Sequence, residues 1–227
     1  MRATFPRGQD TTRAVSSSQL NVILHQERMA EPVGDPREAW AESERLARRA
    51  ASGDRSAQRE LFQQLKRRLH ATLYRIMGST EAMEDLLQDT FIEVFRSLPS
   101  YRGESQLGTW ADRIAIRVAY RHIRQARARK RSAPPVAALS LVGAGEADML
   151  HREGVRRLYR VLSDMSPEYR AAFALFVVDG RSLREVADVV GISLVAAKSR
   201  VWRARRQVMA AARDDSVLAR YLSQEKD

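Results

Sequence analysis

Five basic side chains near residue 200 are the side chains of this 227-residue chain best suited to bind a charged partner. They are Lys198, Arg200, Arg203, Arg205 and Arg206. No acidic residue follows Lys198 until Asp214. Ammonium and guanidinium groups neutralise phosphates, and a helix that carries them can also bond base edges in a major groove. The chemistry indicated is the binding of nucleic acid.

The residues before this cluster predict the elements that hold it. Ser166 followed by Pro167 favours a helix start, because the hydroxyl caps a free N–H and proline fits the first helical position. Gly180 ends that helix. Ser182 and Glu185 lie three residues apart and predict a capping box, which starts a second helix. Its apolar positions form one stripe: Leu183, Val186, Ala187 and Val190.

A third helix follows a tight turn. Gly191 favours the left-handed turn, Ile192 is the apolar residue for the corner, and Ser193 caps the helix that carries the basic cluster. This order predicts a helix-turn-helix whose third helix lies in a major groove. A generic three-helix bundle with a solvated basic face fits the same pattern, but the spacing of caps and glycine favours DNA binding.

A second basic segment lies in the first half of the chain. From Arg113 to Arg131 there are seven Arg and one Lys and no acid. A polar loop with Tyr101 (residues 100–108) precedes this segment, and Trp110 lies at the start of its helix. Aromatic rings stack on unpaired bases while arginines neutralise the backbone, so the combination suits single-stranded nucleic acid. Core packing is favoured for Trp110, and both roles stay open for Tyr101.

Acidic residues interrupt this basic half. Residues 81–93 contain no Lys or Arg and five acids: Glu81, Glu84, Asp85, Asp89 and Glu93. From the residues alone, the favoured interpretation is a solvated helix face whose early acids favour the helix N-terminus, and the alternative is a docking surface for a basic protein. Asp85 and Asp89 share a helix face, but no third ligand converges on them, so we expect no metal site.

The charge lies in two blocks. The net charge is +11. Residues 40–131 hold 19 basic and 11 acidic side chains, a net of +8, and residues 152–213 hold 13 and 6, a net of +7. Two separate blocks suggest two modules that each meet phosphate.

Composition excludes several classes of protein. Cysteine is absent, and no apolar run approaches the length of about 20 residues that spans a membrane. The first ten residues lack the apolar core of a signal peptide. We therefore expect a soluble, cytoplasmic protein without membrane insertion. The four histidines are scattered and no phosphate-binding glycine loop occurs, so we expect no enzyme active site and no cofactor.

The predicted fold class is all-α, with two small helical domains joined by a flexible linker and a helix-turn-helix in the second. The expected bounds are a largely disordered extension (1–39), a first domain (40–131), a linker (132–151), a second domain (152–213) and an unassigned tail (214–227). The linker is rich in Ala, Pro and Gly and should extend rather than pack; its 18 residues from Ser132 to Met149 span at most about 60 Å.

Within the first domain, the pattern predicts four helices. The first opens near Trp40 and ends around Gly53, and Asp54 or Ser56 caps a long second helix that ends at Gly78. Ser79 or Thr80 caps the third, which runs to Pro99, and the fourth starts near Thr109. The long helix has one apolar face: Leu61, Phe62, Leu65, Leu69, Leu73 and Ile76.

Both domains resemble one family, the extracytoplasmic-function sigma factors of bacterial RNA polymerase. The first-domain segments that carry the resemblance are residues 52–55, 83–91, 100–105 and 109–115, and the second-domain segments are residues 162–170, 191–193 and 198–205. A helix-turn-helix alone would be weak evidence. Both sets in the right order, separated by a short linker, make the resemblance specific.

The resemblance implies three contact surfaces. The first would dock on the clamp helices of the largest polymerase subunit: Glu84, Asp85, Leu86, Gln88 and Asp89. The second would capture the melted minus-ten strand: Tyr101, Arg102, Trp110, Arg113, Arg117, Arg121 and Arg124. The third would read the minus-thirty-five duplex: Ser193, Lys198, Ser199, Arg200, Trp202 and Arg203. Further implied partners are the flap of the second-largest subunit and an anti-sigma factor.

The chain departs from the family pattern at two places. Arg117 stands where Asn is common, which leaves the identity of the captured base open, and Val195 with Ala196 replaces a common Gly-Thr pair. Trp202 fits either a base contact or a core position. The alternative functions are a stand-alone helix-turn-helix regulator and a sigma antagonist; the acidic helix and the Tyr101 loop argue against the first, and the basic third helix argues against the second.

Overall fold

The computed structural model describes residues 36–130 and 146–223, and within them every regular element is helical. This confirms the all-α fold class. The expected disorder before residue 36 and most of the expected linker (residues 131–145) lie outside the described residues.

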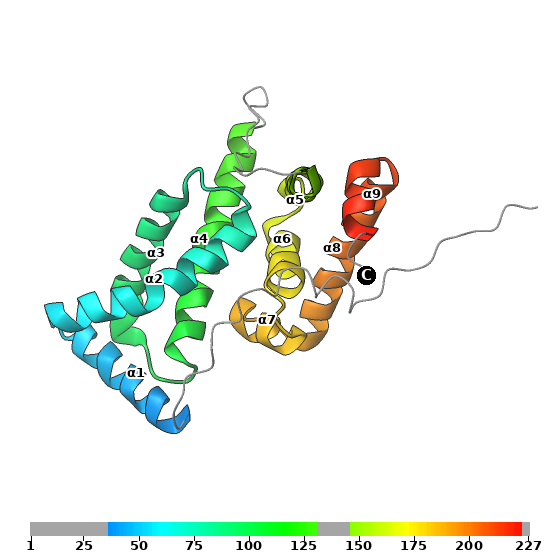
Figure 1. The fold of residues 1–227 in the computed structure, drawn as a ribbon. Coiled ribbons are helices and arrows are strands. Elements are labelled where there is room, and N and C mark those ends of the chain that lie inside the picture. Colours follow the sequence, from blue (N-terminus) through cyan, green and yellow to red (C-terminus); the bar gives the residue numbers. More distant parts are fainter. Residues whose placement is uncertain (1–35, 131–145, 224–227) are drawn as a thin grey trace, which may run out of the picture.

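The first helical group holds four α-helices around one core (Figure 1). Their bounds are α1 (Pro36–Ala51), α2 (Arg55–Met77), α3 (Met83–Ser97) and α4 (Leu107–Lys130), with a short 3₁₀ turn, η1 (Leu98–Ser100), after α3. The long α2 packs on α1, α3 and α4. Its predicted apolar face is buried except for Phe62, which is half-buried.

The second helical group holds the helix-turn-helix. Its elements are α5 (Glu146–Ser163), α6 (Pro167–Phe173), a π-helical turn η2 (Ala174–Val178), α7 (Leu183–Val190), α8 (Leu194–Arg213) and α9 (Ser216–Ser223). Helix α8 packs on α6, α7 and α9, and α5 packs on α9. A second apolar cluster, with Leu162, Phe173 and Leu218 at its centre, fills the space between them.

Most of the predicted helix ends are confirmed. The Asp54 carboxylate accepts the N–H groups of Ser56 and Ala57 at the start of α2. In the second domain, Ser182 and Glu185 form the predicted capping box, and the Ser193 hydroxyl accepts the Ala196 N–H. Gly191 takes the left-handed conformation with φ of 73°, as the turn requires.

Three predicted helix starts differ from the structure, and the tail that was left unassigned is helical. The first helix starts at Pro36, before the expected domain edge at residue 40. Neither Ser79 nor Thr80 caps α3: its N-cap is Ala82, at φ of 76°, without a side-chain hydrogen bond. Helix α5 begins at Glu146, inside the expected linker, and the tail forms α9. In α9, Leu218, Tyr221 and Leu222 are buried, and the Asp215 carboxylate caps its start by accepting the N–H groups of Val217 and Leu218.

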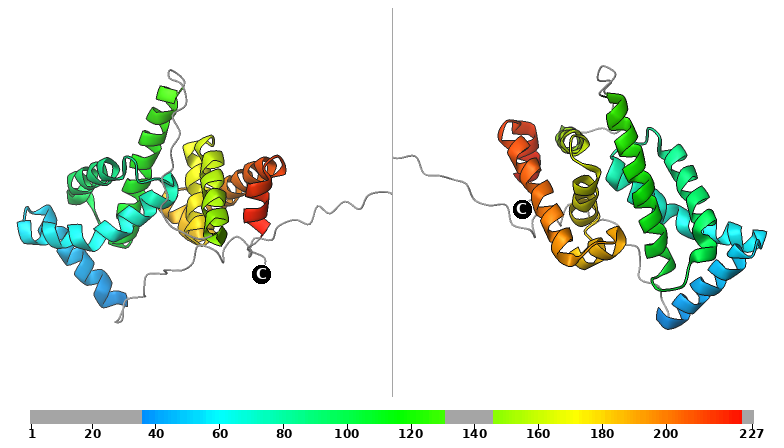
Figure 2. Two further views of the ribbon diagram at one scale, coloured as in Figure 1. Left: turned by 45° about the horizontal axis from the view of Figure 1, so that its top comes forward. Right: turned by 180° about the vertical axis from the view of Figure 1, so that it is seen from behind.

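The two helical groups lie side by side in every ribbon view (Figures 1 and 2). Helices α6 and α7 contact α4, and η2 contacts α2. The core of the first group continues across this boundary onto Leu175, Val186 and Val189. The second group is therefore packed against the first in this structure.

Candidate nucleic-acid and protein interfaces

The acidic surface lies on α3. Glu84, Asp85 and Gln88 are exposed, and so is Asp89, which forms an ion pair of 3.8 Å with Arg121 of α4. Leu86 corrects the expectation: it is 2% exposed and packs in the core, so it supports this surface without being able to contact a partner. Helix α3 therefore presents its negative charge to solvent and is held in place by the packing of its buried face.

An apolar groove runs beside these acids, between α2 and α3. It has a volume of about 740 Å³, and its lining includes Phe62, Phe91 and Ile92, together with Glu84 and Gln88. The rings of Phe62 and Phe91 lie 4.4 Å apart, and Ile92 is 49% exposed. The lining also includes Lys66 and His70, so Glu84 is the one acid among the described residues that line this groove; its apolar floor suits the apolar face of an amphipathic helix.

In the loop before α4, the Tyr101 ring packs against the Trp110 ring of α4. The ring centroids of Tyr101 and Trp110 are 5.2 Å apart, and the Tyr101 hydroxyl donates to the Ser105 carbonyl at 2.8 Å. Both side chains are half-buried, and burial together with the nearby Glu44 carboxylate raises the pKa of Tyr101. Part of each ring is packed and part remains available for stacking on a base, while Arg102 is exposed.

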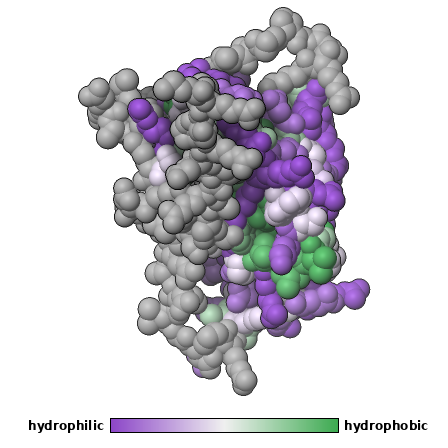
Figure 3. All heavy atoms as spheres, turned by 90° about the vertical axis from the view of Figure 1, so that its right-hand side faces the viewer, coloured by the Kyte–Doolittle hydropathy of each residue, from purple (hydrophilic) through white to green (hydrophobic). Residues whose placement is uncertain are grey.

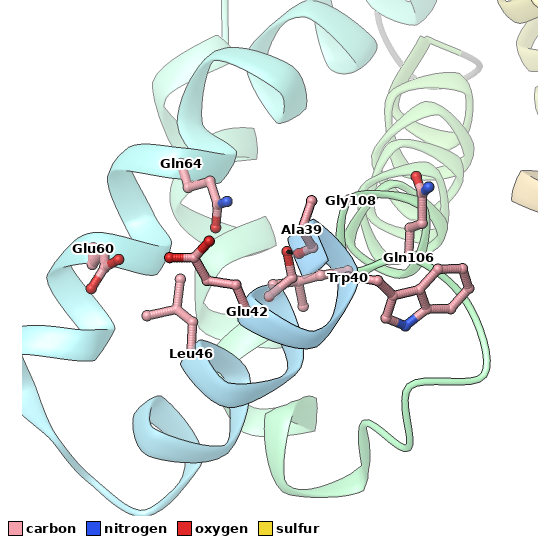
Figure 4. A pocket seen from close by; sticks show the side chains of 10 residues that line it. Ala39, Trp40, Glu42, Leu46, Glu60, Gln64, Gln106 and Gly108 are labelled. Atoms are coloured by element: carbon pink, nitrogen blue, oxygen red, sulfur yellow. Dashed lines mark hydrogen bonds between the residues drawn. The ribbon is translucent and has the colours of Figure 1, made fainter. Parts of the chain in front are cut away.

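A hollow adjoins this loop between α1 and α2 (Figure 4). Its volume is about 380 Å³. Glu42, Glu60 and Gln64 point into it, whereas the indole of Trp40 lies beside Gln106 on the loop side. Trp40 is 37% exposed and lines this hollow with Gln106, so it adds an aromatic side chain beside the Tyr101 loop (residues 100–108) that the sequence did not indicate as a site residue.

The arginines of α4 differ in their surroundings. Arg117 and Arg121 are exposed. Arg113 and Arg124 are also among the expected strand-binding residues, but both donate to the second domain: the Arg113 Nε to the Asp188 carbonyl at 2.9 Å, and Arg124 to the Glu168 carboxylate at 2.6 Å. The structure therefore places all four on α4 but leaves only two without a contact to the second domain.

Helix α8 presents the third expected surface. Lys198, Trp202 and Arg203 are exposed, and Trp202 at 58% is a surface residue and not a core residue. Leu194 and Val195, 49% and 79% exposed, add apolar surface at the start of the helix. Seen from the side of α8 and α9, the described surface is mostly hydrophilic with one apolar area (Figure 3).

Several side chains of this surface have internal partners. Arg203 donates to the Tyr169 hydroxyl at 2.9 Å, and the Arg206 guanidinium lies 5.6 Å from the Trp202 ring centroid. Ser193 serves as the helix cap, so its hydroxyl is engaged. Ser199 and Arg200 are half-buried. Lys198 and Trp202 are thus the residues most freely offered to a major groove.

A buried ionic cluster between the domains was not foreseen. Asp112 is fully buried and accepts hydrogen bonds from Arg68, Thr72 and Arg181 at 2.9, 3.1 and 3.0 Å. Arg181 comes from the turn before α7. The signal in the sequence was the position of Asp112: it falls on the same stripe of α4 as the buried Ala119 and Ile123, where an acid needs a partner.

Within the described parts of the chain, no group of three or more His, Asp or Glu side chains is arranged to hold a metal ion. No helix among the described residues is long and apolar enough to cross a membrane.

Comparison with protein families decides what these surfaces belong to. Residues 61–129 match the model for sigma-70 region 2, and residues 155–208 match the model for sigma-70 region 4. Curated relatives include the ECF RNA polymerase sigma-E factor of Haemophilus influenzae, 26% identical over 174 residues that cover 72% of this chain and 91% of the relative. The chain belongs to the extracytoplasmic-function sigma factors.

Other relatives agree. The sigma-H factor of Pseudomonas aeruginosa is 26% identical and covers 74% of this sigma factor and 92% of its own length. The sigma factor SigE of Mycolicibacterium smegmatis is 30% identical over 70% of this chain and 63% of its own length. As a sigma factor, the chain directs transcription initiation.

Two solved structures share the fold. CnrH, in complex with the cytosolic domain of CnrY, aligns with a TM-score of 0.53 and 23% identity over 76% of this sigma factor and 98% of that chain. RpoE of Bartonella quintana, in complex with the anti-sigma factor NepR, aligns with a TM-score of 0.50 and 22% identity over 69% and 97%. At this identity the likeness supports the fold.

Proposed function

We propose that three separate surfaces of this sigma factor divide the work of initiation. The acidic face of α3, with its apolar groove, binds core RNA polymerase at the clamp helices of the largest subunit. The loop at Tyr101 and the arginines of α4 take the melted minus-ten strand, and α8 reads the minus-thirty-five duplex. Catalysis belongs to the polymerase, and this chain supplies no active site, in keeping with relatives that are all sigma factors.

One observation carries the proposal: a single chain offers both an exposed acidic face beside an apolar groove and an exposed basic recognition helix. A face that binds DNA phosphate has no use for Glu84 and Asp85. A protein partner with basic and apolar side chains does, because charge complementarity guides it and the groove buries apolar surface.

Charge complementarity also supports the DNA surfaces. Arg117 and Arg121 lie one helical turn apart on α4 and can follow successive phosphates, next to aromatic rings on which unpaired bases can stack. On α8, Lys198 can bond guanine or phosphate, and the apolar Val195 and the exposed Trp202 suit thymine methyl groups.

The further partners follow from the relatives. CnrH and RpoE were solved with CnrY and with an anti-sigma factor, respectively. We propose that an anti-sigma factor also restrains this chain, and that the polymerase flap holds its second domain. Its work would be done in the cytoplasm, where it meets core polymerase.

The test of polymerase binding uses Glu84→Gln combined with Asp85→Asn. This pair is chosen over Asp89 because removal of Asp89 would also release Arg121. The double variant should lose co-elution with core polymerase on size exclusion, whereas the exposed Asp214→Asn should co-elute as the wild type does. Unchanged co-elution of the double variant would disprove the docking face.

The test of promoter reading uses Lys198→Ala and, as a matched control, Arg213→Ala, an exposed basic residue in the last turn of the same helix. Reconstituted holoenzyme transcribes fragmented genomic DNA, and transcript starts are sequenced. Lys198→Ala should lose most specific starts while still binding polymerase. Tight duplex binding by the chain alone, with no polymerase dependence, would instead establish the stand-alone regulator.

A further inference from the structure

A tyrosine that belongs to none of the three expected surfaces contacts the recognition helix. Tyr169 lies on α6, which packs on α8 (Figure 1). Its hydroxyl accepts a hydrogen bond of 2.9 Å from Nη1 of Arg203. Arg203 is exposed and is one of the residues that we assign to the minus-thirty-five duplex, whereas Tyr169 is half-buried. The bond therefore joins a supporting helix to a side chain of the DNA-reading surface.

The position of Tyr169 is fixed by the residues around it. The Ser166 hydroxyl caps α6 by accepting the Tyr169 N–H, and Pro167 occupies the first turn, so the backbone of Tyr169 is held at the helix start. Its ring packs against the second apolar cluster. A tyrosine side chain has only two rotatable χ angles, so little freedom remains once the ring is packed. The hydroxyl oxygen is thus an acceptor at a defined place.

Arg203 needs such an acceptor because its own side chain is long. The rotamer freedom of an exposed arginine corresponds to about 2 kcal/mol, which DNA binding would otherwise have to remove. A hydrogen bond to a fixed hydroxyl restricts the guanidinium before DNA arrives. Preorganisation of this kind increases affinity for the ligand that fits the restricted geometry, and so increases discrimination against ligands that do not.

The atom that Tyr169 engages leaves the most selective edge of the arginine for DNA. The bond uses Nη1, whose N–H groups lie on the far side of the guanidinium from the Nε–H. The other edge, Nε together with Nη2, carries two parallel N–H groups, and Arg68 directs that same edge at Asp112, at 3.1 and 2.9 Å. Two parallel donors match the O6 and N7 acceptors of guanine in the major groove. Tyr169 therefore holds the arginine by a donor that a bidentate guanine contact does not use.

We propose that Tyr169 is a positioning residue for promoter recognition, which holds Arg203 so that its Nε and Nη2 edge binds one guanine of the minus-thirty-five element. The proposal rests on the assignment of α8 to this duplex made above. Tyr169 acts through Arg203 and determines how strictly one base pair is recognised. Without the hydroxyl, the guanidinium also reaches phosphate oxygens and the acceptors of other bases, and recognition of that base pair is relaxed.

The test uses Tyr169→Phe in the full chain, reconstituted with core polymerase. The variant loses one oxygen and keeps the packed ring, so the melting temperature should stay within about 2 °C of the wild type. The template is a promoter identified from wild-type transcript starts, with its minus-thirty-five base pairs randomised and a barcode downstream of the start. Sequenced transcripts then give the preference for each base at each position.

The expected effect is confined to one base pair. Arg203→Ala should abolish the preference for guanine there and leave the preferences elsewhere. Tyr169→Phe should lower the preference at the same base pair by about threefold to tenfold, as the loss of one hydrogen bond implies. In the Arg203→Ala background, Tyr169→Phe should have no further effect, because the side chain that it holds is gone.

The matched control is Tyr159→Phe, another loss of a tyrosine hydroxyl from the same domain. The Tyr159 hydroxyl donates to the Arg75 carbonyl at 2.7 Å and has no bond to α8 among those that the structure describes. Tyr159→Phe should therefore leave the base preferences unchanged even where it lowers stability. A loss of guanine preference equal to that of Tyr169→Phe would assign the effect to weakened packing and contradict positioning.

Arg203→Lys tests the pair from the side of the arginine. A lysine keeps the positive charge and can still donate to Tyr169, but it has no second edge with parallel donors. The guanine preference should fall as far as in Arg203→Ala, while total transcription falls less. Retention of the guanine preference by Arg203→Lys would show that the parallel donors do not read the base, and the positioning role would then be wrong.

The remaining outcomes separate the positioning role from the assignment of α8. If Arg203→Ala lowers transcription from all templates alike, Arg203 reads no base, and that part of the proposed function fails with the positioning role. If Arg203→Ala removes the guanine preference and Tyr169→Phe does not weaken it, only the positioning role is overturned. A Tyr169→Phe effect that is uniform over all positions, or that persists in the Arg203→Ala background, likewise overturns positioning and leaves the proposed function standing.

Discussion

Replacement of Gly78 by alanine should destabilise the contact between the two domains. Gly78 ends α2 with φ of 67°, a conformation that favours glycine. A Cβ atom built there would overlap the ring of Tyr159, which is 7% exposed and belongs to the second domain. The substitution thus combines backbone strain with displacement of an interdomain ring.

The two contributions can be separated with Gly53. This residue also has a positive φ, 91°, but a Cβ atom there would meet nothing within 4 Å. Gly53→Ala should therefore cost only the left-handed strain, about 1–2 kcal/mol. Gly78→Ala adds the loss of a buried aromatic side chain, about 1.5–3 kcal/mol, and of its hydrogen bond to Arg75, about 1 kcal/mol. The expected total is about 3.5–6 kcal/mol.

Urea unfolding of both variants checks the difference, together with the distance between spin labels on Gln63→Cys of α2 and Gln207→Cys of α8, two exposed positions in a chain without cysteine. If the second domain detaches before the first unfolds, Gly78→Ala will show a longer distance in the absence of urea and a broadened transition. Equal midpoints for Gly53→Ala and Gly78→Ala, with an unchanged distance, would refute the packing of Tyr159 on Gly78 and with it the interdomain anchor.

Three other predictions test separate features. Ser182→Ala should lower the free energy of unfolding by about 1 kcal/mol in urea titrations, because it removes the cap of α7; Ser182→Thr should restore most of that loss. Tyr120 and Tyr159 should ionise at higher pH than free tyrosine, because burial raises the pKa of both hydroxyls. Their contribution to stability is therefore present below pH 10 and is lost as pH rises through the raised pKa values. At about pH 11 the folded chain should show markedly less tyrosinate absorbance than the unfolded chain. Trp202→Ala should leave the melting temperature within about 2 °C of the wild type while reducing specific transcript starts, because the indole is exposed and packs little in the core.

The helix-turn-helix could be predicted residue by residue because its signals are local. Ser182, Glu185, Gly191 and Ser193 act on backbone groups within four residues of themselves, and each takes the expected role. Helix α9 carries signals of the same kind, although the sequence analysis left the tail unassigned. The Asp215 carboxylate accepts the N–H groups of Val217 and Leu218, and Leu218, Tyr221 and Leu222 follow helical spacing and are buried in the second core.

Whether a signal is local also explains which parts of the candidate site could be predicted from the sequence. Acid and base clusters are visible in the sequence, so the faces of α3, α4 and α8 were expected and their exposure agrees. Leu86 was assigned to the polymerase contact because the segment that carries the resemblance, residues 83–91, contains core positions as well as exposed positions. Trp40 was missed because its proximity to the Tyr101 loop arises from the packing of α1 on η1 and α4, which no local pattern records.

The contact between the domains could not be predicted from the sequence, because its partners, such as Arg181 with Asp112 and Asp179 with Arg75, lie far apart along the chain. Buried ion pairs contribute little net stability compared with apolar packing, because desolvation offsets much of the attraction, yet removal of one partner is costly. Burial alone would lower the pKa of Arg181, but Asp112 and Asp179 raise it above its ordinary value, so the group stays charged and its geometry specific. A contact of this kind therefore fixes the geometry of the two domains more than it adds to their net stability.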